Sequence, residues 1–229
     1  MFLFRWTKLL IILCELFLNN ISNNMSNNET KLQPNKKTAN ILKLLTLGNS
    51  CVGKSSIVIR YTENKFYSSY LTTIGVDFLR KVITVGDKEV NLQIWDSAGQ
   101  EKYNSISKQY YNKADGIILV FDLNNRTTFD GMMNWLDEIE ASSAKGIPIV
   151  IVGNKCDLTT REISSDEAYE FAETKNIPYF ETSALSGHNV NEAIYKLVEI
   201  ALEFQAKKIS DKKAVTLKTT GDNKERCCK

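Results

Sequence analysis

The chain has 229 residues, of which 43% are hydrophobic and 24% are charged, a composition that lies in the ordinary globular range and excludes disorder throughout. The formal net charge is +2, but the segment from Lys207 onward holds eight basic and three acidic residues, which leaves residues 25–206 mildly acidic. An acidic body argues against nucleic-acid binding, because that function usually needs a basic face. The five cysteines are odd in number and scattered, so they predict neither a disulfide framework nor a zinc site and favour a reducing compartment.

Residues 1–24 begin with an apolar stretch and end rich in asparagine. The longest uninterrupted apolar run, Leu9–Cys14, is much shorter than the ~20 residues that a membrane-spanning helix needs. Three interpretations stay open: a secretory signal, although no small-residue cleavage site follows; an interfacial anchor; or an upstream extension of the gene model with Met25 as the physiological start, which we favour. Residues 25–40 are rich in asparagine and lysine, and we expect a flexible lead-in.

Alternating strands and helices are predicted for residues 41–206, which we take as one domain. Apolar runs rich in β-branched residues predict buried strands, and segments with a 3.6-residue apolar period predict the helices between them. The expected strands are Ile41–Leu47, Asp77–Val85, Glu89–Trp95, Gly116–Phe121, Pro148–Val152 and Ile177–Phe180. The expected helices begin at Lys54, cover Phe129–Ile139, cover Ser165–Thr174 and run from Val190 to Phe204.

The second and third strands are joined across Gly86–Asp87, which predicts an antiparallel hairpin. The fold class is therefore α/β, with a mixed, mostly parallel six-stranded sheet and helices on both faces. Ligands of such sheets bind at the carboxyl ends of the strands, and the informative residues of this chain fall at those ends.

The first of these ends carries a phosphate-binding loop. Gly48–Ser55 matches the pattern G-x-x-x-x-G-K-[ST] directly after a strand and before a helix. Gly53 allows a close backbone approach, Lys54 reaches the β- and γ-phosphate oxygens, and the Ser55 hydroxyl suits Mg²⁺. We expect Cys51 to be a small filler of this loop rather than a reactive thiol.

Two further strand ends carry residues that suit a guanine base. Asn154–Asp157 has the form N-K-x-D, in which the Asp157 carboxylate accepts hydrogen bonds from two donors on one edge of guanine. We expect this carboxylate to be buried, so that adenine leaves it unmatched. Glu181–Leu185 brings the backbone N–H of Ala184 to the guanine oxygen. His188, the only histidine, is expected to be a loop residue without a catalytic role.

The strand ending at Trp95 leads into residues that suit the γ-phosphate. Asp96 is placed to support the Mg²⁺ shell, and Gly99 permits a backbone N–H to approach the γ-phosphate. Gln100 is able to orient an attacking water molecule. Each short motif alone is compatible with an ordinary turn, and their joint occurrence in this order is what favours the phosphate interpretation.

The sequence resembles the Ras superfamily and, within it, the Rab family of vesicle-traffic GTPases. The resemblance covers residues 41–206, and its most Rab-like segments are Ile74–Phe78, Leu92–Glu101, Tyr110–Ala114 and Gly116–Asp122. It implies that Thr73 closes over Mg²⁺ and the γ-phosphate, that Phe66 lies against the guanine ring and that Lys155 packs beside it. It also implies an effector surface formed by Phe78, Trp95 and Tyr110, each of which is by spacing alone equally well a core aromatic.

Together these arguments define the expected site. The predicted catalytic residues are Gln100, Lys54 and Thr73, and the predicted metal ligands are Ser55, Thr73 and Asp96. The predicted nucleotide contacts, for GTP or GDP, are Gly48, Ser50, Cys51, Val52, Gly53, Lys54, Ser55, Ser56, Phe66, Thr73, Gly99, Asn154, Lys155, Asp157, Ser183, Ala184 and Leu185. Departures from the family pattern at Asn49, Ser97, Phe121 and Leu185 remove none of these contacts.

The expected mechanism is slow, Mg²⁺-dependent GTP hydrolysis. Arg60 and Arg80 are best explained as exposed helix and strand residues, so no catalytic arginine is identified within the chain. We therefore expect a GTPase-activating protein to raise turnover. The resemblance further implies an exchange factor, effectors, a prenylation escort and a GDP-dissociation inhibitor as partners of a monomer. The alternatives are a nucleotide-locked effector-binding module with negligible hydrolysis, and a phosphate-loop kinase or ATPase, which would let ATP compete.

Residues 207–229 are expected to form a basic, flexible tail that ends in Cys227 and Cys228. Adjacent terminal cysteines look like the doubly prenylated end of Rab proteins, although a disordered tail with idle thiols is the alternative. Two lipids anchor a protein stably where one is marginal, and lysines add about 1 kcal/mol each near anionic lipid. The implied location is the cytoplasmic face of an intracellular or plasma membrane, with a soluble cytosolic pool.

Overall fold

A computed structural model of the chain describes residues 40–68, 73, 76–97, 110–143 and 146–221, with side chains described as far as residue 210. Its sheet has six strands in the order β2-β3-β1-β4-β5-β6. The strands are β1 (Asn40–Leu47), β2 (Val76–Val85), β3 (Lys88–Ser97), β4 (Gly116–Asp122), β5 (Ile149–Asn154) and β6 (Tyr179–Thr182). Among the strands of the described residues, only the β2–β3 pair is antiparallel, which confirms the predicted mixed, mostly parallel sheet and its hairpin.

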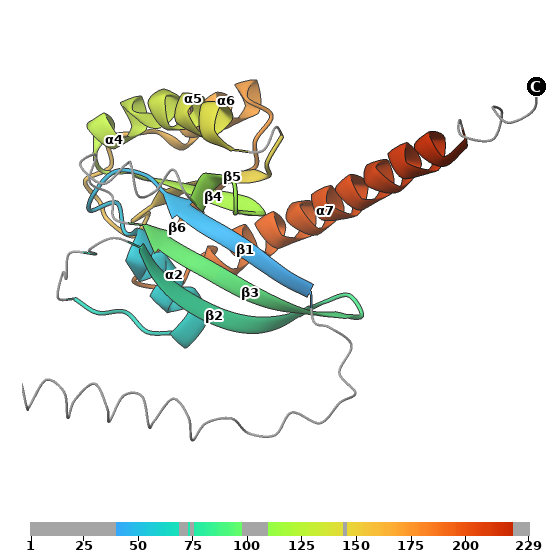
Figure 1. Cartoon of the computed structure of the whole chain (residues 1–229). Coiled ribbons are helices and arrows are strands. Elements are labelled where there is room, and N and C mark those ends of the chain that lie inside the picture. The colour runs from blue at the N-terminus through green and yellow to red at the C-terminus, as the bar shows by residue number, and fades with distance from the viewer. Residues whose placement is uncertain (1–39, 69–72, 74–75, 98–109, 144–145, 222–229) are drawn as a thin grey trace, which may run out of the picture. The chain divides into compact units, whose positions relative to one another are not determined.

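Helices cover both faces of the sheet (Figure 1). The helices α2 (Lys54–Glu63) and α7 (Val190–Gly221) pack on one face, where Ile57, Leu197 and strand residues such as Leu44 are buried together. The helices α4 (Arg126–Asp130), α5 (Met132–Ser142) and α6 (Ser165–Thr174) pack on the other, around Phe121 and Met132. Removing these apolar side chains from water supplies the main favourable term for the fold.

Two helices differ from the prediction. The segment expected to be one helix over Phe129–Ile139 is divided between α4 and α5 at Gly131. The last helix continues to Gly221, so the prediction of a flexible tail from residue 207 is wrong for residues 207–221. Five lysines, which are good helix formers, lie in this stretch, and no glycine or proline interrupts it before Gly221.

The carboxyl ends of β1, β3, β5 and β6 point to one edge of the sheet, where the loops that follow them meet. The candidate site therefore lies where the parallel topology brings four separate loops together.

Within the described ranges, none of the helices has the length and apolar character that crossing a membrane requires.

Candidate functional site

The loop between β1 and α2 has a backbone that two glycines make possible. Gly48 and Gly53 have φ values of 134° and 97°, a region that side chains rarely adopt. A Cβ on Gly48 would lie 2.0 Å from the Val120 carbonyl oxygen, and one on Gly53 would lie 2.3 Å from Nδ2 of Asn154. The chain therefore curls tightly into the N-terminus of α2, where unpaired N–H groups and the helix dipole favour a bound anion.

Lys54 lies inside this loop and is only 5% exposed. Its ammonium group donates hydrogen bonds to the carbonyl oxygens of Gly48 (2.9 Å) and Asn49 (2.8 Å). Burial lowers the pKa of Lys54 to about 8, although the nearby Asp96 and Cys51 act in the opposite direction. A buried cation held by two neutral carbonyls gains strongly from an anionic ligand.

Ser55, Thr73 and Asp96 converge beside Lys54 from three different segments. The hydroxyl oxygens of Ser55 and Thr73 are 2.9 Å apart, and the Ser55 hydroxyl donates a short hydrogen bond to the Asp96 carboxylate. Asp96 is 3% exposed, and burial raises its pKa against the opposing effects of Ser55 and Lys54. All three predicted metal ligands are thus brought together.

This group fits Mg²⁺, which prefers hard oxygen ligands and uses few carboxylates. In the described part of the chain, no cluster of three or more histidine, cysteine, aspartate or glutamate side chains offers a different metal site. A residue that the sequence argument missed, Thr46, orients the carboxylate by donating a hydrogen bond of 3.1 Å to Oδ1 of Asp96. Its signal was a polar residue within the apolar run Leu44–Leu47, paired in register with Asp96.

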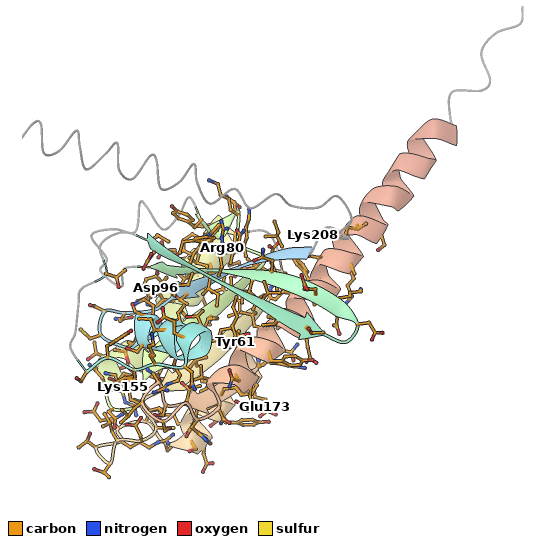
Figure 2. The ribbon with its side chains drawn as sticks, turned by 90° about the horizontal axis from the view of Figure 1, so that it is seen from below. Tyr61, Arg80, Asp96, Lys155, Glu173 and Lys208 are labelled. Carbon is orange, nitrogen blue, oxygen red and sulfur yellow. The ribbon has the colours of Figure 1, made fainter. Side chains whose placement is uncertain are left out.

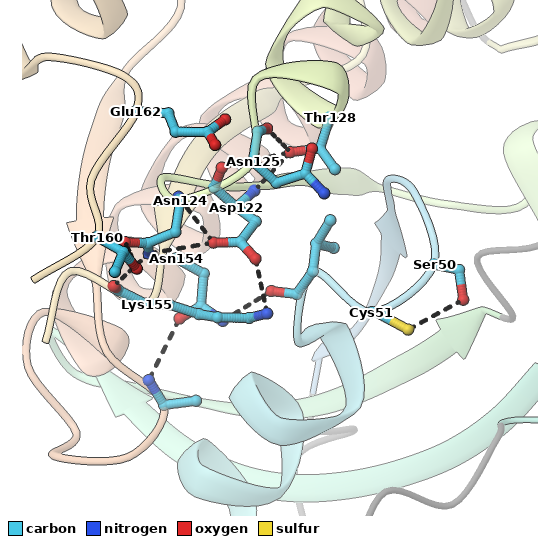
Figure 3. A network of polar contacts seen from close by, with 12 residues as sticks. Ser50, Cys51, Asp122, Asn124, Asn125, Thr128, Asn154, Lys155, Thr160 and Glu162 are labelled. Carbon is cyan, nitrogen blue, oxygen red and sulfur yellow. Dashed lines mark hydrogen bonds and ion pairs between the residues drawn. The ribbon is translucent and has the colours of Figure 1, made fainter. Parts of the chain in front are cut away.

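Asn154 joins the phosphate loop to the loop after β6 (Figure 3). Its Nδ2 donates to the Val52 carbonyl (2.9 Å), and its Oδ1 accepts from the Thr182 hydroxyl (3.1 Å) and from the Ala184 backbone N–H (3.3 Å). The side chain is 1% exposed, so these bonds are shielded from water. Asn154 therefore acts as a brace within the protein, and Val52 and Ala184 are both attached to it.

Lys155 and Asp157 follow Asn154 but differ in how they are held. Lys155 has a left-handed backbone (φ 66°), and its ammonium group pairs with Asp122 at 2.7 Å (Figure 3). Asp122 in turn accepts the backbone N–H of Asn124, which leaves it well partnered. Asp157 is exposed, so the expectation that its carboxylate is buried is wrong.

The remaining predicted nucleotide contacts differ in how far they are exposed. Phe66 and Leu185 are 37% and 53% exposed, so a flat base would find apolar surface on both. Ser183 is fully buried, whereas Ser50 and Ser56 are half-buried. Cys51 is exposed and has a left-handed backbone (φ 64°), so it does not fill space in the loop as expected. His188 is an exposed loop residue, as predicted.

The three aromatic residues expected at an effector surface adjoin one another. Phe78 pairs with Trp95 across the β2–β3 register, and the rings of Trp95 and Tyr110 meet edge to face at 4.9 Å. Phe78 is 38% exposed, whereas Trp95 is 9% exposed and also belongs to the core. The strip formed by Phe78, Trp95 and Tyr110 thus rests on one register pair, Phe78 with Trp95, and one ring contact, Trp95 with Tyr110.

Four predicted site residues lie outside the described residues: Gly99, Gln100, Cys227 and Cys228. Of the two arginines expected to be exposed, Arg80 is exposed on β2 (Figure 2). Arg60 is half-buried instead, and its side chain donates hydrogen bonds to the carbonyl oxygens of Ala184 and Leu185. The expectation for Arg60 is therefore wrong, because the loop after β6 folds back onto α2.

Three features together are typical of the class of guanine-nucleotide-binding α/β domains: a phosphate-type loop with two glycines at positive φ, the adjoining oxygens of Ser55, Thr73 and Asp96, and an N-K-x-D segment held by Asn154. The sequence model of the Ras family matches residues 43–203. The chain is 40% identical over 178 residues to "Ras-related protein Rab-3" of Caenorhabditis elegans, covering 77% of this chain and 81% of the relative. It is 36% identical over 170 residues to "Ras-related protein Rab-15" of Homo sapiens, covering 74% and 80%.

A yeast relative is similar to the same region: the chain is 43% identical over 154 residues to "GTP-binding protein YPT1" of Saccharomyces cerevisiae, covering 67% of this chain and 75% of the relative. The chain belongs to the Ras family and, within it, to the Rab small GTPases. It is accordingly a GTPase whose ligands are GTP, GDP and Mg²⁺.

Proposed function

We propose that this Rab-family protein is a membrane-anchored switch of vesicle traffic that recruits effectors in its GTP state and hydrolyses GTP slowly. The observation that carries the proposal is the convergence of Ser55, Thr73 and Asp96 beside the buried Lys54. These segments are far apart in the sequence, and their polar atoms adjoin at the one edge of the sheet where a triphosphate would lie.

At the phosphate end, Lys54 exchanges its two carbonyl contacts for the β- and γ-phosphate oxygens of GTP. Ser55, Thr73 and Asp96 hold Mg²⁺, which supplies charge neutralisation on the phosphates. Gln100 orients the attacking water, and the loop amides stabilise the charge that develops during transfer. The protein thus contributes positioning and electrostatics, the two effects on which phosphoryl transfer mainly depends.

Slow turnover follows from the positions of Arg60 and Arg80. Arg60 is bonded to carbonyls of the loop after β6, and Arg80 is exposed on β2. Neither is placed to neutralise charge at the γ-phosphate. A GTPase-activating protein that inserts an arginine would then raise the rate on the order of 10³ to 10⁵.

The switch depends on Thr73 and Gly99, which contact the γ-phosphate and release it after hydrolysis. Thr73 already lies beside Ser55, which supports its assignment to this site. The strip formed by Phe78, Trp95 and Tyr110 continues from the same two segments, so a change at the γ-phosphate reaches the surface offered to effectors.

At the base end, Asp157 accepts two hydrogen bonds from guanine, and Phe66 and Lys155 pack against its ring. Ala184 donates its backbone N–H to the 6-oxo oxygen. Exposure of Asp157 supports this role, because the carboxylate is accessible to an incoming base.

Membrane attachment is assigned to prenyl groups on Cys227 and Cys228, with the escort and dissociation-inhibitor proteins of the family as partners. The lysines after residue 206 add attraction to the anionic cytoplasmic leaflet. Replacement of both cysteines by serine is expected to move the protein from membranes to the cytosol, which cell fractionation would detect. Unchanged membrane association would contradict the lipid assignment.

The enzymatic part of the proposal is tested by single-turnover hydrolysis of GTP with the full chain. We expect slow phosphate release that requires Mg²⁺, is further slowed by Gln100→Leu and is unaffected by Arg80→Ala. Tight GTP binding without Mg²⁺-dependent release would instead identify a nucleotide-locked module that recruits effectors without hydrolysis.

A further inference from the structure

The guanidinium group of Arg60 donates four hydrogen bonds, all to neutral acceptors. Its Nε donates to the Ala184 carbonyl (2.8 Å), and its Nη2 donates to the Leu185 carbonyl (2.7 Å). Its Nη1 donates to the carbonyl oxygen (3.1 Å) and side-chain oxygen (3.3 Å) of Asn64. Such a fork needs the fixed planar geometry of arginine, which the single ammonium of lysine does not reproduce.

The two sets of bonds have different explanations. Asn64 caps the C-terminus of α2, and a cation in the last turn of a helix commonly interacts with its final carbonyls. Ala184 and Leu185 lie on a different loop, more than 120 residues away along the chain. Because all four acceptors are neutral, the contact fixes a geometry rather than neutralising a charge.

Arg60 binds the carbonyls of Ala184 and Leu185, which come immediately after the Ala184 backbone N–H that we assign to guanine. This N–H of Ala184 lies 3.3 Å from Oδ1 of Asn154, at the long end of hydrogen-bond distances, so Asn154 holds it weakly. Arg60 restrains the same residue from its other side. The stem of Arg60 also runs past Gly187, where the loop turns with φ 87°.

Arg60 belongs to α2, whose first turn carries Lys54 and Ser55. A helix keeps a constant rise per residue and deforms little. The same rigid element therefore carries the phosphate contacts at one end and restrains the guanine-facing loop near the other.

We propose that Arg60 is a positioning residue for base recognition, which sets the Ala184 N–H at the place where it meets the 6-oxo oxygen of guanine. This inference rests on the proposed guanine site and adds the element that keeps that site in register with the phosphate loop.

The test compares GDP with 6-thio-GDP, which replaces only the oxygen that Ala184 would contact by a weaker acceptor. Affinities are measured by displacement of a fluorescent GDP from the full chain, for wild type, Arg60→Ala, Arg60→Lys and the matched control Arg80→Ala. We expect Arg60→Ala to weaken GDP about tenfold, the range of one lost hydrogen bond. It should weaken 6-thio-GDP about twofold, so the preference for oxygen falls about fivefold.

Arg60→Lys should recover part of that preference, because one of the two carbonyls keeps a donor, and Arg80→Ala should leave it unchanged. If Arg60→Ala weakens both nucleotides equally, Arg60 is only a structural cap and the inference is wrong. Circular dichroism separates either result from misfolding, and Arg60→Lys still tests the preference if the alanine variant does not fold. A wild-type protein that does not prefer GDP over ADP would instead remove the guanine site itself.

Discussion

The phosphate half and the base half of the site are prepared for a ligand in different ways. In the phosphate half, Lys54, Ser55 and Asp96 are buried or half-buried and bonded to one another or to their own loop. In the base half the frame is buried around Asn154, whereas Phe66 and Asp157 are exposed.

This difference in burial indicates how each half of the site selects its ligand. Buried charges with neutral partners are costly, so the phosphate half is stabilised by any ligand that supplies charge of the right sign. An exposed carboxylate gains little from charge alone because water already solvates it. The base half must therefore select by the geometry of its hydrogen bonds, which requires a rigid frame.

The largest expected effect is a loss of GTP affinity when Lys54, in the phosphate half, is replaced. Lys54→Ala removes the buried ammonium group, and we expect GTP affinity to fall on the order of 10² to 10³, because contacts between a charged donor and phosphate are among the strongest hydrogen bonds. Isothermal titration against the exposed control Lys65→Ala measures this effect. Affinity within threefold of wild type would mean that the loop binds phosphate without Lys54.

The next effect tests the base half. Asp157→Asn replaces an acceptor by an amide whose NH₂ is able to donate to the 2-oxo group of xanthine, so we expect GTP to weaken about a hundredfold relative to XTP. Competition of both nucleotides against fluorescent GDP gives the ratio, with Asp137→Asn on α5 as the control. An unchanged ratio would remove Asp157 from the base site.

A smaller effect concerns the connection between the halves. Asn154→Ala leaves the Val52 carbonyl and the Thr182 hydroxyl without their buried partner, which should lower the free energy of unfolding by about 2 kcal/mol. Urea denaturation measures the loss, with exposed Asn134→Ala as the control. Equal stability of the two variants would show that Asn154 is not a brace.

The smallest expected effect concerns the ion pair between Arg161 and Glu181 in the base half. Arg161 donates hydrogen bonds to both carboxylate oxygens of Glu181, and the pKa of Glu181 is lowered chiefly by this contact. A carboxyl group whose pKa is lowered in the folded protein stabilises the fold at pH values above its pKa in the unfolded chain, about 4.5. This stabilisation is lost as the pH falls through the folded pKa.

Because the pair is partly exposed, Arg161→Ala should cost less than about 1 kcal/mol at pH 7. The deficit should shrink in acid, where Glu181 is protonated in both proteins. Urea unfolding at neutral and acidic pH, with Arg80→Ala for comparison, measures it. A deficit that grows in acid would contradict the assignment.

Short-range patterns predicted most of the framework. The motif from Gly48 to Ser55 depends on local backbone geometry and helix initiation, and the hairpin across Gly86–Asp87 depends on turn chemistry, so both were readable in sequence. The strand ends placed Asp96 and Asn154 at one edge, because parallel strands share the direction of their carboxyl ends.

The features that were missed depend on contacts between distant segments. Thr46 reaches Asp96 only through strand register, and Asp122 reaches Lys155 only because β4 and β5 are neighbours. Arg60 read as a surface residue because nothing local indicates that the loop after β6 folds onto α2.

The central claim is that one edge of the sheet binds a guanosine triphosphate together with Mg²⁺. Displacement of fluorescent GDP from the full chain by GTP and by ATP, each with Mg²⁺ and with a chelator, tests it most directly. The account predicts that GTP competes far better than ATP and that chelation weakens GTP binding. Equal competition by ATP and GTP, or binding indifferent to Mg²⁺, would contradict it.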